Sequence, residues 1–227
     1  MPDSSPEADR WLPSGAAQAG LTALRHHVAG HQRGRIFILS APSGAGKDSV
    51  IERLKQDEVA INYTLHTTTR RPRPDEIDGE HYRFITPEQF RAERDRGGFL
   101  EWATYLDSYY GTPRAPVEQA LARGEAVLAK PDVQGAMQIR AQYPDAVLIF
   151  LAPPDTGELV ARLSGRGTES QAERQRRVER SLAEIAHIPQ YDYLVINHHG
   201  RLDDTVTKVK AIIVAEQQRV YVAPRRP

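Results

Sequence analysis

Cysteine is absent from the 227 residues of this chain, which excludes disulfide bonds, cysteine-based metal sites and cysteine nucleophiles. Long apolar runs are also absent, because no stretch approaches the roughly 20 residues that span a bilayer, so no membrane contact is expected. Neither charge is in excess, since 30 Lys and Arg residues balance 30 Asp and Glu residues. Nucleic acid is not an expected partner either, because a general nucleic-acid-binding protein would carry a basic excess.

The composition is that of an ordinary globular protein, with 40% hydrophobic and 26% charged residues. Residues 1–33 differ from the rest, beginning with Pro, Ser, Asp and Glu and continuing with Gly and Ala. They hold no apolar signal-peptide core, and their acidic residues disfavour an organelle transit peptide, so the expected location is the cytoplasm. We expect a disordered or weakly helical extension over 1–33 and a flexible tail over 221–227.

Short apolar runs alternate with helical stretches along residues 34–220. The four runs are Ile36–Leu39, Ala126–Ala129, Val147–Leu151 and Tyr193–Ile196. Near-continuous apolar strands are typical of a parallel sheet covered by helices on both faces. The alternation therefore predicts an α/β fold with right-handed crossovers.

Capping residues predict where several helices begin. Thr86, followed by Pro87 and Gln89, is expected to open one short helix. Thr112 should cap another helix, with Pro113 at its first position. Asp203 should cap the last helix, which we expect to reach about Gln218.

A glycine-rich loop lies between the first strand and a helical stretch. Its residues 41–49 read Ala-Pro-Ser-Gly-Ala-Gly-Lys-Asp-Ser. Glycines can turn successive N–H groups inward, the helix N-terminus adds positive charge, and Lys47 can reach the outer phosphates. The usual pattern G-x-x-x-x-G-K-[ST] is broken at Ala41 and Asp48. The loop therefore predicts a phosphate cradle, and the alternative is a turn that carries a surface lysine.

Seven motifs between Arg35 and Val214 resemble those of guanylate kinases. They are TTTRRPRP from residue 67, DGEHYRF from 78, GFLEWA from 98, YYGT from 109, DVQGA from 132, RLSGRGT from 162 and YDYLVIN from 191. The resemblance implies transfer of the γ-phosphate of ATP to GMP, and possible use of dGMP, with Mg²⁺ as cofactor. It also implies a P-loop NTPase-type core over 34–220, with a GMP-binding insertion at about 67–112 and a lid at about 154–177.

The resemblance also assigns the GMP site. Arg70 and Arg73, with Tyr82 and Tyr110, would hold the acceptor phosphate, because guanidinium forks match phosphate oxygens and phenols add directional donors. The alternative is a solvated basic loop. The base side would be formed by four further residues, namely Glu101, Asp132, Glu76 and His66.

A carboxylate accepts both the N1–H and the exocyclic amine of guanine, and adenine offers no equivalent pair. Glu101 stands at the family position for this role, with Asp132 as a second acceptor. Glu76 resembles another GMP-side position. His66 replaces a serine that is common in relatives, so it either donates to guanine O6 or is only a packed histidine at a strand end.

On the ATP side, the resemblance implies binding by the loop residues and an adenine-side asparagine, for which the alternative is an ordinary turn residue after a strand. The ATP-binding set is Ser43, Gly44, Ala45, Gly46, Lys47, Asp48, Ser49 and Asn197. Transfer needs alignment and charge neutralisation rather than a general base, because the GMP phosphate is already a nucleophile. The expected catalytic cations are Lys47, Arg70, Arg73 and the lid arginines Arg162, Arg166 and Arg177.

Two residues depart from the family pattern together. Relatives commonly have a hydroxyl where this chain has Asp48, and an acid where it has Lys130. We interpret this as a charge exchange, in which Asp48 becomes a Mg²⁺ ligand and Lys130 pairs with it or touches phosphate. A separation beyond about 4 Å would reject the pairing, and the alternative is a solvent-facing Lys130.

Two other functions compete with GMP phosphorylation. The sequence Lys47-Asp48-Ser49 also resembles the loop of ribose bisphosphate phosphokinases, which have no guanine to read. Scaffold proteins contain guanylate-kinase-like binding modules, but those usually lose the phosphate loop that this chain retains. The expected partners are ATP and GMP, with the chain acting as a monomer or homodimer.

Overall fold

The computed structural model describes residues 14–31, 34–105, 107–164 and 171–219. Its core is a five-stranded sheet in the order β2-β7-β1-β8-β9, and every pair of neighbouring strands in it is parallel. The strands are β1 Ile36–Ser40, β2 Asn62–Tyr63, β7 Val127–Ala129, β8 Val147–Ala152 and β9 Tyr193–Ile196. The four predicted strands are therefore confirmed. The edge strand β2 was not predicted, because two partly polar residues leave no apolar run.

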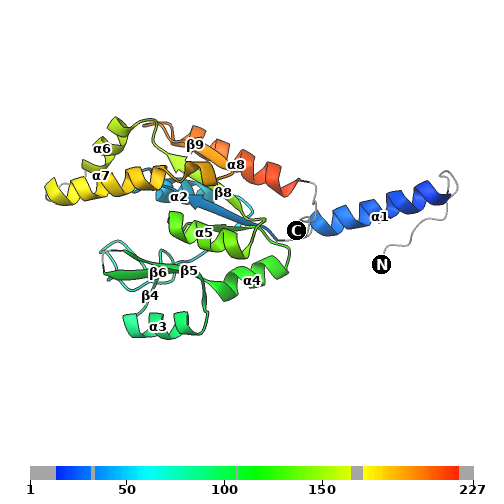
Figure 1. Ribbon diagram of the computed structural model, residues 1–227, viewed down its shortest axis with the longest axis horizontal. Coiled ribbons are helices and arrows are strands. Elements are labelled where there is room, and N and C mark those ends of the chain that lie inside the picture. The colour runs from blue at the N-terminus through cyan, green and yellow to red at the C-terminus, as the bar shows by residue number, and fades with distance from the viewer. Residues whose placement is uncertain (1–13, 32–33, 106, 165–170, 220–227) are drawn as a thin grey trace.

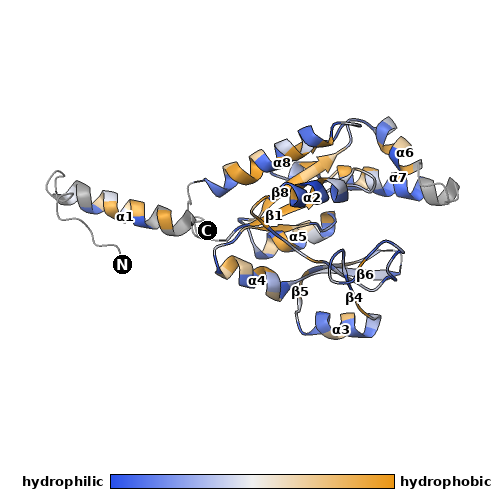
Figure 2. Cartoon of the chain, turned by 180° about the vertical axis from the view of Figure 1, so that it is seen from behind, coloured by the Kyte–Doolittle hydropathy of each residue, from blue (hydrophilic) through white to orange (hydrophobic). Residues whose placement is uncertain are grey.

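Helices cover both faces of this sheet, which explains why its strands are apolar at successive positions. On one side lie α2 Lys47–Gln56 and α8 Leu202–Gln217, and on the other α4 Arg114–Ala122 and α5 Val133–Gln142. Alternate side chains of β1 enter the two cores: Phe37 and Leu39 join the first, and Ile36 and Ile38 the second. Figure 2 shows the hydrophobic strands between these layers. The predicted α/β fold is confirmed.

The insertion between β2 and α4 forms a second, smaller sheet in the order β4-β3-β6-β5. Its elements are β3 Thr67–Thr68, β4 Arg83–Phe84, α3 Pro87–Asp95, β5 Phe99–Tyr105 and β6 Ser108–Pro113. Figure 1 shows this sheet and α3 set apart from the large sheet, with α4 leading back to it. Fully buried Phe90 stacks on Phe99 and Tyr109, with ring centroids 4.4 and 5.1 Å away.

The remaining elements lie near the N-terminus and between β8 and β9, where the lid is predicted. Two helices, α6 Thr156–Ser164 and α7 Gln171–Ile185, occupy most of the lid interval, and the 3-10 helix Ile188–Gln190 precedes β9. Helix α1, Ser14–His31, projects away from the rest of the chain in Figure 1. The domain boundaries stay predictions. No helix in the described part of the chain is long and apolar enough to cross a membrane.

The helix starts agree with the sequence in one case and differ in two. Thr86 accepts from the Gln89 amide at 3.2 Å and forms the predicted capping box of α3. The prediction for Thr112 is wrong, because it lies within β6, which continues to Pro113, and turns its hydroxyl to Glu101. The prediction for Asp203 is also wrong, since α8 begins at Leu202 without a side-chain cap.

We predict that Phe90→Ala removes about 3–5 kcal/mol from the free energy of unfolding, because it empties a fully buried aromatic position. Phe90→Leu should cost less, since much of the volume remains. Urea unfolding followed by circular dichroism measures both. A loss below about 1 kcal/mol for the alanine variant would show that the stack does not hold the small sheet together.

Candidate active site

The loop between β1 and α2 has the backbone of a phosphate cradle. Gly44 and Gly46 have φ values of 82° and 91°, which lie in the left-handed region that favours glycine. Among the described residues that carry a side chain, only Glu58 and Asp107 have a positive φ. Ala41 therefore does not need to be glycine, and its departure from the usual pattern has no conformational cost.

Asn197, at the end of β9, braces this loop. Its Nδ2 donates to the carbonyl of Ala45 at 2.7 Å, and its Oδ1 accepts from the Thr205 hydroxyl at 2.9 Å. A Cβ on Gly46 would lie 2.6 Å from the same Nδ2. Asn197 is buried in the structure, so its sequence-based interpretation as an ordinary turn residue is wrong. Its contact with adenine stays a prediction.

The side chain of Lys47, the first residue of α2, reaches the residues that follow the neighbouring strand β7. Its Nζ donates to the carbonyls of Lys130 and Pro131 at 2.9 and 3.2 Å. Burial lowers the pKa of Lys47 below its ordinary value. The loop lysine is therefore tied to backbone oxygens, which a phosphate can replace.

The predicted pairing of Asp48 with Lys130 is confirmed. Lys130 Nζ donates to Asp48 Oδ1 at 3.0 Å, and the alternative of a solvent-facing Lys130 is wrong because its side chain is only 18% exposed. Partial desolvation beside the loop acts to raise the pKa of Asp48, but the charges of Lys130 and Lys47 outweigh it and lower that pKa. Burial likewise opposes the charge of Lys130, but attraction to Asp48 raises its pKa. Both side chains are therefore ionised at neutral pH.

The structure brings three of the four predicted acceptor-phosphate residues into one cluster. The guanidinium of Arg70 lies 5.1 Å from the centre of the Tyr82 ring, and the Tyr82 and Tyr110 rings are 6.3 Å apart. Glu76 holds Arg70 through two hydrogen bonds of 2.5 and 2.6 Å, which keep the pKa of Glu76 at about 2. Glu76 therefore orients Arg70 in this state. Arg73 is exposed, and its backbone N–H donates to Glu76.

A buried hydrogen-bonded chain contains two of the predicted base-side residues. His66 Nε2 lies 2.6 Å from the Thr112 hydroxyl, which donates to Glu101 Oε1 at 2.6 Å. All three side chains are buried. Burial, with the nearby charges of Lys130 and Lys47, holds the pKa of His66 well below its ordinary value, so its ring is neutral. When Glu101 is ionised it can only accept, so the Thr112 hydroxyl donates its hydrogen to Glu101. The Thr112 oxygen must then accept from His66, whose Nε2 carries the ring proton.

Glu101 lies beside the start of α5. Burial raises the pKa of Glu101 to about 7, and the nearby charge of Asp132 also acts to raise it. A Cβ on Gly135 would lie 2.5 Å from Glu101 Oε2, so this carboxylate needs a glycine in α5. Asp132 caps the same helix by accepting from the Gly135 amide at 2.9 Å. The structure therefore brings Glu101 and Asp132 together.

Two of the three predicted lid arginines reach the phosphate loop. Arg162 donates to the carbonyls of Ala45 and Asn197 at 3.2 and 2.8 Å, and it also pairs with Glu158. Arg177 Nη2 lies 3.2 Å from the Ser43 hydroxyl. Arg166 falls outside the described residues.

Comparison with known proteins agrees with this geometry. The guanylate kinase family model matches residues 33–216. Guanylate kinases from Desulfitobacterium hafniense and Thermus thermophilus are 40% and 44% identical, over 84% and 82% of this chain and 94% and 84% of their own. The chain belongs to the guanylate kinase family. The crystal structure of the guanylate kinase from Anaplasma phagocytophilum aligns with a TM-score of 0.66 at 28% identity, covering 83% of this chain and 88% of that one.

Two residues of this guanylate kinase family member were missed as site residues. Thr112 follows a glycine and precedes a proline, which suggested a helix cap, and only the pairing of β5 with β6 turns it toward Glu101. Arg180 was not among the predicted site residues. Its guanidinium lies 4.4 Å from the Tyr105 ring centre and 3.8 Å from Asp132, so α7 contacts the small sheet. No sequence motif marks Arg180.

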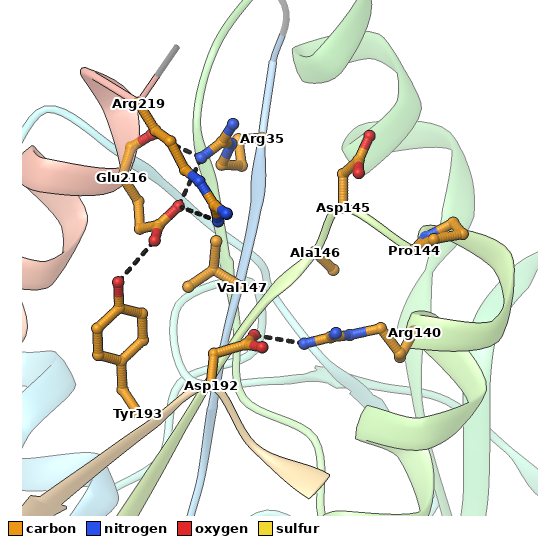
Figure 3. A pocket seen from close by; sticks show the side chains of 10 residues that line it. All are labelled: Arg35, Arg140, Pro144, Asp145, Ala146, Val147, Asp192, Tyr193, Glu216 and Arg219. Atoms are coloured by element: carbon orange, nitrogen blue, oxygen red, sulfur yellow. Dashed lines mark hydrogen bonds and ion pairs between the residues drawn. The ribbon is translucent and has the colours of Figure 1, made fainter. Parts of the chain in front are cut away.

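A cavity of about 670 Å³ opens at the opposite edge of the large sheet, where β8 and β9 begin (Figure 3). Several of its charged groups pair with one another: Glu216 contacts Arg35 and the Tyr193 hydroxyl, and Asp192 contacts Arg140. None of the predicted site residues lines it. This cavity is therefore separate from the candidate active site.

We predict that Gly46→Ala destabilises the protein more than Gly79→Ala. Both glycines have a positive φ, which costs a side chain about 1–2 kcal/mol, but only Gly46 also faces Asn197, since a Cβ on Gly79 meets nothing within 4 Å. Thermal unfolding of the two variants separates backbone strain from the close approach. Equal losses would contradict a contact between Gly46 and Asn197.

The raised pKa of Glu101 predicts how stability depends on pH. Between its ordinary pKa of 4.5 and its folded value of about 7, the unfolded chain releases this proton while the folded chain retains it. The free energy of unfolding should therefore fall with rising pH across that window, by up to about 3 kcal/mol from this group. Urea unfolding from pH 5 to 8 should show the fall in the wild type and a smaller one in Glu101→Gln. Parallel profiles would contradict the prediction.

Proposed function

We propose that the described site carries out ATP-dependent phosphorylation of GMP, giving GDP and ADP, the reaction of guanylate kinases. One observation supports this best: Lys130 contacts both the phosphate-loop helix, through Asp48, and the acceptor cluster, through Tyr82. A donor phosphate on the loop and an acceptor phosphate beside Arg70 would therefore be neighbours. The residues that we assign to GMP are assigned to its base and its phosphate, so dGMP would also be a substrate.

ATP would place its phosphates in the loop of residues 43–49, where amide groups and the N-terminus of α2 favour anions. Lys47 would exchange its two backbone carbonyls for the outer phosphate oxygens. Asn197 would lie beside the adenine while continuing to brace Ala45. The backbone carbonyls of Lys130 and Pro131 would thus hold the Lys47 ammonium group at the place where it meets the phosphate.

GMP would bind with its phosphate at Arg70, Arg73, Tyr82 and Tyr110. Its guanine would meet the free carboxylate oxygen of Glu101, with Asp132 as a second acceptor. The buried acceptor Glu101 makes the site selective, because adenine would leave it unpaired at a cost of several kcal/mol. His66 would complete the base side, either directly or through Thr112.

Mg²⁺ is the cofactor that we propose for ATP. The described residues contain no group of three or more acidic, histidine or cysteine side chains that could hold a metal ion. This fits Mg²⁺ in a kinase, which is held by one or two carboxylates together with substrate phosphates. The exposed carboxylate of Asp48 would be that ligand. Bound there, the ion would neutralise phosphate charge.

Transfer itself would depend on alignment and on neutralising charge on the moving phosphoryl group. Lys47 would supply one fixed charge, and the lid arginines Arg162, Arg166 and Arg177 would add others when the lid excludes water. Arg162 and Arg177 already contact the loop. We expect this reaction in the cytoplasm, carried out by a monomer or homodimer.

The two competing functions are less well supported. A ribose bisphosphate kinase has no use for a buried carboxylate like Glu101 beside its acceptor site. A scaffold module has no use for a glycine-rich loop that carries a lysine and is contacted by two arginines from α6 and α7.

We predict that the purified chain phosphorylates GMP with ATP and Mg²⁺ and does not turn over AMP or ribose bisphosphate. Glu101→Gln should lower kcat/KM for GMP about 100- to 1000-fold. The side-chain NH₂ of glutamine is a donor, and it would face the N1–H and amine donors of guanine. The ATP affinity of the variant should not change. A coupled ADP-release assay and calorimetry measure these quantities.

Turnover of AMP at a rate comparable to that of GMP would contradict the assignment of Glu101. Failure to bind ATP would instead favour a binding module. Glu118→Gln, an exposed change on α4, is a matched control for loss of one carboxylate and should leave GMP turnover unchanged.

A further inference from the structure

We propose that Lys130 is a phosphate-binding residue that leaves Asp48 and contacts the acceptor phosphate when GMP binds. This inference rests on the proposed function, and it adds a cation to the arginines and tyrosines described above. Lys130 follows β7 directly, at the edge of the sheet where the strands end. It is therefore positioned by the core rather than by a mobile loop.

The position of the ammonium group supports the proposal. Lys130 Nζ lies 4.8 Å from the centre of the Tyr82 ring, and the Arg70 guanidinium lies 5.1 Å from the centre of the same ring. Two cations thus contact one tyrosine that is expected to hold the acceptor phosphate. A phosphate dianion placed beside Tyr82 and Arg70 would lie within reach of Lys130.

The strength of the present pairing also favours an exchange. The side chain of Asp48 is 78% exposed and contacts Lys130 through a single oxygen at 3.0 Å. A pair with one exposed partner is screened by solvent and contributes little to stability, whereas charge-assisted hydrogen bonds to phosphate are shorter and stronger. Arg70, by contrast, is held by two hydrogen bonds from Glu76. Lys130 is therefore the cation of the cluster that can move most easily.

The exchange would also release Asp48. With Lys130 on the acceptor phosphate, the Asp48 carboxylate becomes available to a cation that accompanies ATP. The acid on α2 and the base after β7 would then serve the two nucleotides separately. The exchange therefore explains both departures from the family pattern, the acid at Asp48 and the base at Lys130, together.

The test compares the affinities of GMP and guanosine, because their ratio reports contacts to phosphate alone. Both are titrated into the full chain by calorimetry in a buffer with EDTA and without ATP, so that Mg²⁺ plays no part. Lys130→Met keeps the length of the side chain and removes its charge. It should lower the GMP-to-guanosine affinity ratio about 10-fold, with guanosine affinity unchanged. Lys130→Arg should retain most of the ratio.

Asp48→Asn separates this proposal from a purely structural pair. If Lys130 binds phosphate, Lys130→Met should lower the ratio as strongly in the Asp48→Asn background as in the wild type. If Lys130 only neutralises Asp48, the loss disappears in that background, and the proposal is overturned. Lys208→Met, an exposed change on α8, is the matched control and should leave the ratio unchanged.

The remaining outcomes separate the role of Lys130 from the proposed function. An unchanged ratio in Lys130→Met, with GMP still bound by the wild type, overturns the role of Lys130 alone. Absence of GMP binding by the folded wild type overturns the proposed function as well. Guanosine binding by each variant shows that its base site is folded.

Discussion

Burial of both faces of the parallel sheet is the constraint on which the site depends. Because β1, β7, β8 and β9 are covered by helices, polar side chains are concentrated where the strands end. The phosphate loop follows β1, Lys130 and Asp132 follow β7, and Asn197 ends the run of β9. Parallel strands end at the same edge of the sheet. The topology therefore brings these segments together, although no local sequence pattern specifies a contact between them.

A second regularity is that four described cations of the site have oxygen partners within the chain itself. Lys47 is held by backbone carbonyls, Arg70 by Glu76, Lys130 by Asp48, and Arg162 by Ala45 and Asn197. Unpaired charges in a partly buried site would be costly, and they would repel one another. Substrate phosphates would replace these oxygens. Each of these four cations is therefore neutralised or solvated by an oxygen of the chain.

The contacts predicted best from the sequence were those between residues with complementary charge on neighbouring elements. Asp48 and Lys130 were paired because both depart from the family pattern and because the residue after a loop lysine faces the adjacent strand. Thr112 and Arg180 were not predicted as site residues. Threonine before proline is also a common helix start, and an arginine on a charged helix usually faces solvent, so local patterns gave no reason to prefer the observed contacts.

The sequence by itself determined the four main strands of the large sheet, their alternation with helices, the phosphate loop and the family, because apolar periodicity and motif spacing are local properties of the chain. Only the tertiary structure decided that Ala41 needs no glycine, that Asn197 braces the loop, and that Glu101 reaches His66 through Thr112. Those facts depend on backbone angles, on burial and on strand register, which arise when distant segments pack against one another. Burial in particular changes Glu101 from an ordinary acid into one whose pKa is about 7.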